Sequence, residues 1–168
     1  RESLITWFSW SPSRRRSFTR GSLSTMTDTP DRPEFVDRTP EQPADLMDGV
    51  EALRAMNPNS LMHRMGIEVL EASAQRLVAT IPVEGNTQPY GLLHGGVSVV
   101  LAETLGSCGA AYSCPEGHRA VGLDINANHL RAATNGWVTG TARPVHIGRT
   151  TQVWQIDIAN EAGDMVCV

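Results

Sequence analysis

One apolar stretch, residues 97–112, constrains the fold more than any other part of the sequence. It is too long for one buried strand and is rich in Ala, Leu and small residues, which indicates a helix. The β-branched Val97, Val99 and Val100 weakly favour a strand instead. Apolar residues surround the predicted helix on every side, so we expect it to be buried rather than amphipathic. Such a helix needs cover all round, which a strongly curved sheet and a partner subunit together can provide.

This predicted helix contains a single carboxylate, Glu103. A glutamate is rarely buried unless another group pairs with it or the protein uses it. Ser107 lies one turn on along the same face, while Gly95 opens the helix with a free backbone N–H group and the positive end of the dipole. His94 and Gln88 lie on the turn-rich loop that leads in. This set suits acyl transfer or hydrolysis. Alternatively, Glu103 is a buried polar residue held by a Ser, a Thr or a backbone group.

The charge is unevenly divided along the 168 residues, a length typical of one domain with a sizeable core. All 14 basic residues are Arg, and residues 1–25 hold five of them beside one acid, Glu2. From Met26 onward nine Arg face seventeen Asp and Glu. The acidic balance excludes a general nucleic-acid binder, which would carry a basic face. No apolar run of about 18 residues occurs, so we expect no membrane span.

Three cysteines, Cys108, Cys114 and Cys167, are an odd number, and their spacing fits no zinc pattern. Free thiols in a reducing cytoplasm are the simplest interpretation, so we expect a cytoplasmic protein without a metal. Cys108 lies in the apolar helix, where we expect it to pack rather than to act as a nucleophile.

The first 44 residues do not resemble part of a fold, and we expect a disordered or non-native extension there. A short apolar patch at residues 5–10 precedes a Ser- and Arg-rich segment. Arg15-Arg16 resembles a twin-arginine export signal, but the polar residues from Thr19 onward lack the necessary apolar stretch. The composition also resembles a transit peptide. We favour the simpler interpretation that Met26 is the start of the protein and that residues 1–25 are upstream sequence read in the same frame. Residues 26–44 are rich in Pro and acids, which predicts disorder.

Residues 45–168 are expected to form one α+β domain. Alternating and β-rich runs predict two strands before the long helix and four after it. The predicted elements are helical segments at 45–56 (capped by Asp45) and 60–64, and strands at 66–71, 75–83, 120–130, 136–145 (broken at Pro144), 151–158 and 164–168. This order predicts an antiparallel sheet wrapped around one long central helix. The last strand pattern stops part-way, so we expect that strand to be truncated.

Several motifs lie between the loop before the long helix and the last strands. They are NTQP at 86–89, GLLHGG at 91–96, LAE at 101–103, GS at 106–107, GLDINANH at 122–129 and VWQI at 153–156. From about Ser60 to the last residue, the sequence resembles the hotdog-fold acyl-CoA thioesterases of the phenylacetate-pathway and 4-hydroxybenzoyl-CoA branch. Within that branch it most resembles the members that hydrolyse 1,4-dihydroxy-2-naphthoyl-CoA for menaquinone biosynthesis.

The resemblance implies a catalytic role for five residues. Glu103 matches the carboxylate that attacks the thioester carbonyl or activates water. The backbone N–H of Gly95 would polarise the thioester oxygen. Gln88 and His94 match residues that position the thioester and assist the leaving group or water, although His94 as a structural loop residue is also open. Ser107 matches a residue that holds substrate or water beside Glu103.

The resemblance also implies where coenzyme A binds and how the subunits assemble. The implied CoA contacts are Gly122, His129, Leu130, Arg131, Ala132, Val145, His146, Ile147, Gly148, Arg149 and Thr150. In the family two subunits pair their sheets edge to edge and dimers form tetramers. Each site is built from two chains, so Glu103 and Gln88 are expected to serve one thioester from different subunits. The acyl-CoA is the substrate, and no metal, redox cofactor, nucleic acid or membrane is implied.

Two rival functions share this fold. A dehydratase or hydratase acting on carrier-protein or CoA substrates usually has a His-Phe-Pro-Gly motif further upstream, whereas this loop has Gln-Pro-Tyr-Gly and places His94 directly before the glycines. A non-enzymatic acyl-CoA-binding module has no need for a lone Glu103 in an apolar helix. The acyl group stays open between aryl, naphthoyl, phenylacetyl-type and medium-chain acids.

Overall fold

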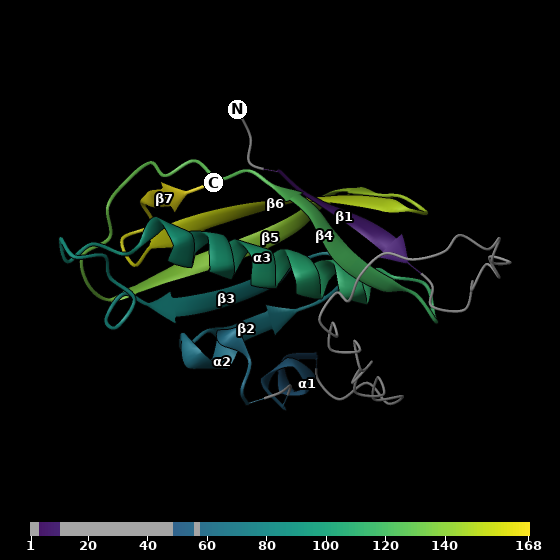
Figure 1. Cartoon of the computed structure of the whole chain (residues 1–168), viewed down its shortest axis with the longest axis horizontal. Helices are drawn as coiled ribbons and strands as arrows, with labels where there is room; N and C mark the ends of the chain where they lie inside the picture. The colour runs from purple at the N-terminus through teal and green to yellow at the C-terminus, as the bar shows by residue number, and fades with distance from the viewer. Residues whose placement is uncertain (1–3, 11–48, 56–57) are drawn as a thin grey trace, which may run out of the picture.

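The computed structural model describes residues 4–10, 49–55 and 58–168. In this part of the chain seven strands form one sheet, and the longest helix lies across one face of it (Figure 1). The helices are α1 (Gly49–Ala55), α2 (Leu61–Arg64) and α3 (Gly95–Tyr112). The strands are β1 (Leu4–Trp10), β2 (Glu68–Ala72), β3 (Leu77–Pro82), β4 (Arg119–Ile125), β5 (Trp137–Ile147), β6 (Thr151–Asn160) and β7 (Met165–Cys167).

All strand pairs of the sheet are antiparallel. The order across the sheet is β2-β3-β5-β6-β1-β4, and β7 pairs with the remaining part of β6. The predicted α+β architecture, with one long helix on an antiparallel sheet, is confirmed. The helical turn predicted at residues 60–64 is also present as α2, which the Ser60 side chain caps by accepting a hydrogen bond from the N–H of His63.

The core lies between α3 and the middle strands of the sheet. Leu101 and Leu105 of α3 are buried with Leu77, Ile81 and other aliphatic side chains of the sheet. Helix and sheet approach closely at Gly109, where a Cβ atom would lie 2.7 Å from the ring of Trp154. A side chain larger than hydrogen at that position therefore cannot fit without moving a fully buried indole.

The buried Gln152 side chain ties the end of α3 to the sheet. Its amide oxygen accepts a hydrogen bond from Nε1 of Trp154 at 3.0 Å, and its amide nitrogen donates to the carbonyl of Ala110 at 3.3 Å. Both ends of the amide are satisfied, so its burial carries little penalty.

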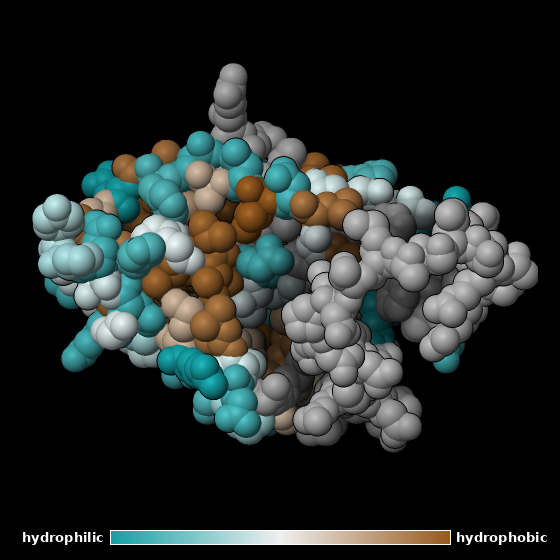
Figure 2. All heavy atoms as spheres, viewed as in Figure 1, coloured by the Kyte–Doolittle hydropathy of each residue, from teal (hydrophilic) through white to brown (hydrophobic). Residues whose placement is uncertain are grey.

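The side of α3 that faces away from the sheet is only partly covered. Val100, Glu103, Thr104 and Ser107 are half-buried there. Figure 2 shows hydrophobic atoms gathered over this helix, with hydrophilic atoms among them. The sheet covers one side of α3, and the expectation that a partner subunit covers the rest stays a prediction.

The first residues take part in the sheet, contrary to expectation. Strand β1 lies between β6 and β4, and its Ile5 pairs with Trp154 on one side and with Ile125 on the other. The prediction that this segment lies outside the fold is therefore wrong for Leu4–Trp10, whose aromatic and β-branched residues favour a strand. Residues 11–48, including the disorder expected at 26–44 and the Asp45 cap, lie outside the described residues.

Two predicted strand boundaries also differ from the structure. Strand β5 continues through Pro144, which pairs with Trp154, and a shift of register between Pro144 and His146 absorbs the proline. Strand β4 ends at Ile125 instead of residue 130. The backbone after it turns toward β7, where the N–H of Leu130 donates to the carbonyl of Val166. No helix within the described residues has the length and apolarity needed to cross a membrane.

Candidate active site

The loop before α3 is fixed by its own backbone and by one asparagine. The N–H of Gln88 donates to the carbonyl of Leu92 at 2.8 Å, which closes the turn. The Asn86 amide nitrogen donates to the carbonyls of Met65 and Pro82 at 3.0 and 2.9 Å, anchoring the loop to the segment before β2 and to the end of β3. Gln88 is therefore held on a rigid support beside the helix start.

The first N–H groups of α3 are satisfied unequally. His94 is the N-cap: its Nδ1 accepts from the N–H of Gly96 at 2.9 Å, and its carbonyl accepts from the N–H of Val97 at 2.8 Å. The N–H of Gly95 donates to no acceptor among the described residues. A helix N-terminus with one unused donor is suited to hold a negative or developing negative oxygen.

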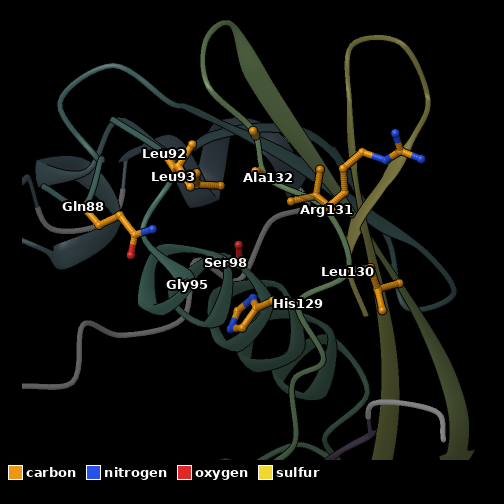
Figure 3. Close-up of a pocket in the computed structure, with 11 residues that line it drawn as sticks. Gln88, Leu92, Leu93, Gly95, Ser98, His129, Leu130, Arg131 and Ala132 are labelled. Carbon is orange, nitrogen blue, oxygen red and sulfur yellow. The ribbon is translucent and has the colours of Figure 1, made fainter. Parts of the chain in front are cut away.

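A cleft of about 330 Å³ opens at this helix start (Figure 3). Residues from the loop, from the start of α3, from the segment 129–133 and from β7 line it: Gln88, Leu92, Leu93, Gly95, Ser98, His129, Leu130, Arg131, Ala132, Ala133 and Val166. The two loops are joined by a hydrogen bond from the N–H of Leu93 to the carbonyl of Ala133 at 2.8 Å. The His129 ring packs against Gly95, where a Cβ atom would lie 2.8 Å from Nε2.

Glu103 lies about two turns further along α3 and is not part of the cleft lining. Its position is eight residues after Gly95, which is about 12 Å along the axis at about 1.5 Å per residue. Burial raises the pKa of the Glu103 carboxyl above its ordinary value. Among the described residues no hydrogen bond or ion pair holds it, so the alternative of a carboxylate tied to a Ser, a Thr or a backbone group finds no support. Ser107 lies on the same half-buried side of α3, as the helical spacing predicts.

Comparisons with known sequences and structures identify the family. A sequence profile of the thioesterase superfamily matches residues 90–167. The 1,4-dihydroxy-2-naphthoyl-CoA hydrolase of Escherichia coli is 48% identical over 120 residues, which cover 70% of this chain and 88% of that protein. The proofreading thioesterase EntH of Cronobacter turicensis is 44% identical over 119 residues, covering 70% and 87%. The crystal structure of a Haemophilus influenzae thioesterase matches with a TM-score of 0.68 at 47% identity, covering 70% of this chain and 83% of that one.

The chain belongs to the thioesterase superfamily. It has the hotdog fold of these enzymes, and it is a thioester hydrolase. In this thioesterase the five predicted catalytic residues do not meet within one chain. Gln88 and Gly95 line the cleft, His94 caps the helix outside the cleft lining, and Glu103 and Ser107 lie further along α3 and outside the lining.

The predicted CoA contacts are also divided. His129, Leu130, Arg131 and Ala132 line the cleft, and Arg131 lies 3.7 Å from Asp164 in an exposed ion pair. The segment 145–150 forms the far end of β5 and the turn into β6. That end is about 30 Å from the start of β5, since a strand rises about 3.3 Å per residue. Gly122 lies in the middle of β4. One chain of the thioesterase therefore does not bring the two segments to one CoA.

Sequence reasoning missed several residues of the cleft. Leu92 and Leu93 were recognised only as part of a motif, and Ala133 and Val166 come from segments that pack there through long-range pairing. Ser98 was overlooked although a signal was present, because it lies one turn after Gly95 on a neighbouring part of the helix face.

Proposed function

We propose that this thioesterase hydrolyses aromatic acyl-CoA thioesters and that its substrate is 1,4-dihydroxy-2-naphthoyl-CoA of menaquinone biosynthesis. The 48% identity to the Escherichia coli hydrolase of that name supports the choice of substrate. The observation that carries the chemistry is the unused N–H of Gly95 at the start of α3, inside a cleft that also holds Gln88. Such a donor stabilises the negative charge that develops on a thioester oxygen.

In the proposed mechanism the Gly95 N–H binds the carbonyl oxygen of the thioester and Gln88 positions the group. Glu103 then reacts in one of two ways. As a nucleophile, its carboxylate attacks the carbonyl carbon, the carbon–sulfur bond breaks, CoA leaves as a thiol after taking up a proton, and water hydrolyses the resulting anhydride. As a general base, Glu103 takes a proton from the water that attacks the carbonyl carbon. The carbon–sulfur bond then breaks, and CoA leaves as a thiol with the proton that Glu103 took up.

The proposed site is completed by a second copy of the chain. A thioester bound at Gly95 is out of reach of Glu103 in the same chain, because the two positions lie about 12 Å apart along the helix. The partly uncovered outer side of α3 offers apolar surface for a partner (Figure 2). In such a dimer, the segments 129–132 and 145–150 of different copies can contact one CoA. We propose a homo-oligomer of this kind, a dimer of dimers in the family pattern.

A thiol-release assay tests the proposal. The full chain is offered naphthoyl-, benzoyl-, phenylacetyl- and medium-chain acyl-CoA thioesters, and kcat/KM is measured for each. We expect the highest kcat/KM with 1,4-dihydroxy-2-naphthoyl-CoA. A clear preference for phenylacetyl- or medium-chain substrates would replace the substrate assignment, and absence of hydrolysis with every ester would favour the dehydratase or the binding module.

A proofreading role is the second candidate, because EntH of Cronobacter turicensis is 44% identical to the chain. The same acyl groups attached to the phosphopantetheine of a carrier protein distinguish the two roles. A higher kcat/KM on the carrier protein than on CoA would favour proofreading.

A further inference from the structure

Two polar side chains are fully buried in the described part of the molecule, and they differ in how they are satisfied. Gln152 has a hydrogen-bond partner at each end of its amide. Ser98 is 2% exposed, and it lines the cleft. Its hydroxyl is not among the fully buried side-chain atoms that lack a partner in the described residues, where only the Ser113 hydroxyl is found. Most buried polar side chains in proteins bond to another protein group, as Gln152 does, whereas Ser98 borders a cleft and can bond to a ligand there.

The Ser98 hydroxyl faces the cleft. Ser98 is among the residues that line it, and Figure 3 shows the side-chain oxygen projecting from α3 toward the cleft. Helical side chains tilt toward the N-terminus of the helix, which brings this hydroxyl over the turn that begins at Gly95. The usual alternative for a helical serine, a bond back to the carbonyl one turn earlier, is not made here. The hydroxyl is therefore available as a donor next to the Gly95 N–H.

The lining of the cleft combines apolar side chains with the basic side chains of His129 and Arg131. Leu92, Leu93, Ala133 and Val166 bring apolar side chains to the same cleft. The His129 ring covers the helix start at Gly95. An oxygen that is uncharged on arrival and becomes negative during the reaction gains most from fixed donors that meet it in the transition state.

We propose that the Ser98 hydroxyl donates a second hydrogen bond to the thioester carbonyl oxygen, beside the N–H of Gly95. This inference rests on the proposed function and adds a catalytic residue to it. The proton stays on Ser98 throughout; the hydroxyl stabilises the oxyanion and takes no part in bond formation.

The test compares Ser98→Ala with Ser113→Ala. Ser113 is the control because it is a serine of the same helix region whose buried hydroxyl has no partner among the described residues, but it lies at the other end of α3 and is not part of the cleft lining. We expect Ser98→Ala to lower kcat by at least about tenfold, toward the ~10²–10³ typical of an oxyanion donor, with little change in KM. Ser113→Ala keeps the wild-type kcat. Neither variant is expected to melt below the wild type, because the Ser98 hydroxyl borders the cleft and the Ser113 hydroxyl has no partner among the described residues.

A carbonyl-free ligand adds a second readout. An S-alkyl-CoA thioether should bind wild type and Ser98→Ala with equal Kd, because it offers no carbonyl oxygen to the hydroxyl. If Ser98→Ala does not fold, Ser98→Cys keeps a side chain of similar shape with a much weaker donor and should show the same loss of kcat.

Three results would overturn the inference: a wild-type kcat in Ser98→Ala, a raised KM with unchanged kcat, or weaker binding of the thioether. A raised KM or weaker binding of the thioether would mean that the Ser98 hydroxyl contacts a part of CoA remote from the carbonyl. Failure of the proposed function looks different, since wild type itself would then hydrolyse none of the CoA thioesters.

Discussion

Two parts of helix α3 carry different halves of the chemistry. Toward the cleft the helix presents donors, the N–H of Gly95 and the hydroxyl of Ser98, which are fixed by the surrounding loops. Away from the sheet it presents an acceptor, Glu103, on a half-buried surface that raises the carboxyl pKa. Donors suit the developing oxyanion and the carboxylate suits attack or proton transfer, but one helix cannot bring both to one carbonyl. The comparison indicates that a complete site needs two helices from two copies.

The largest expected effect is that of Glu103→Ala. Removal of the base or nucleophile should lower kcat for the best CoA thioester by roughly 10²–10⁴-fold. The matched control is Glu116→Ala, which removes an exposed acid just after the same helix and should leave kcat unchanged. Equal kcat values in Glu103→Ala and wild type would take Glu103 out of the mechanism and leave the outer side of α3 without a catalytic role.

A complementation experiment tests the division between these two parts of the helix. Glu103→Ala removes the carboxylate, and Gly95→Ala introduces a methyl group against the His129 ring in the cleft. Each variant alone should be nearly inactive. When subunits of both are mixed equally and reassembled, about half of the dimers are mixed and one of their two sites is intact, so roughly a quarter of the wild-type activity should return. No recovery, in assemblies shown to be mixed, would mean that one chain builds the whole site.

The helix α3 and the candidate catalytic residues on it could be predicted from the sequence, because they depend on residues that are close together in the chain. The length and composition of α3 identify it as a helix, and the glycines before it mark its start. Glu103, Gly95 and Gln88 were all selected from their residue types. The distance of about 12 Å between Gly95 and Glu103 along the axis also follows from helix geometry alone. The residue types by themselves suggest one catalytic set within a chain, and only the family resemblance implies a site shared between two chains.

The remainder depends on contacts between distant segments. Strand β1 pairs with β4 and β6, which lie more than 100 residues later in the chain. The residues next to β1 in the sequence do not indicate these partners. Pro144 is a local strand breaker that the neighbouring strands accommodate with a bulge. Ser98 resembles an ordinary small core residue until the segment 129–133 and β7 close a cleft over it.

A substitution at Gly109 should show that the sheet-facing side of α3 tolerates added volume less well than the outer side of the same helix. Gly109→Val places methyl groups against the buried ring of Trp154, and the overpacking should lower the free energy of unfolding by roughly 1–3 kcal/mol. Ala111→Val on the exposed side of the same helix keeps the β-branched side chain without the clash and should cost less than about 1 kcal/mol. Urea unfolding measures both, and equal losses would contradict the close approach of helix and sheet.

The smallest expected effect concerns the stability contributed by Glu103 itself. Because burial raises its pKa in the folded protein above the unfolded value of 4.5, the folded state binds the proton more tightly than the unfolded state. Wild-type stability should therefore increase as the pH falls through the folded pKa, and it is lowered at neutral pH, where the carboxylate is charged and partly desolvated. Glu103→Gln cannot titrate, so it should be slightly more stable than wild type at neutral pH, by less than about 1 kcal/mol, and this advantage should vanish below pH ~4.5. Melting temperatures of wild type and Glu103→Gln, measured from neutral pH to below pH ~4.5, test this prediction. A variant that is less stable than wild type at neutral pH would show that a partner holds the carboxylate, and Glu103 would then be a structural residue like Gln152 rather than a group kept free for the substrate.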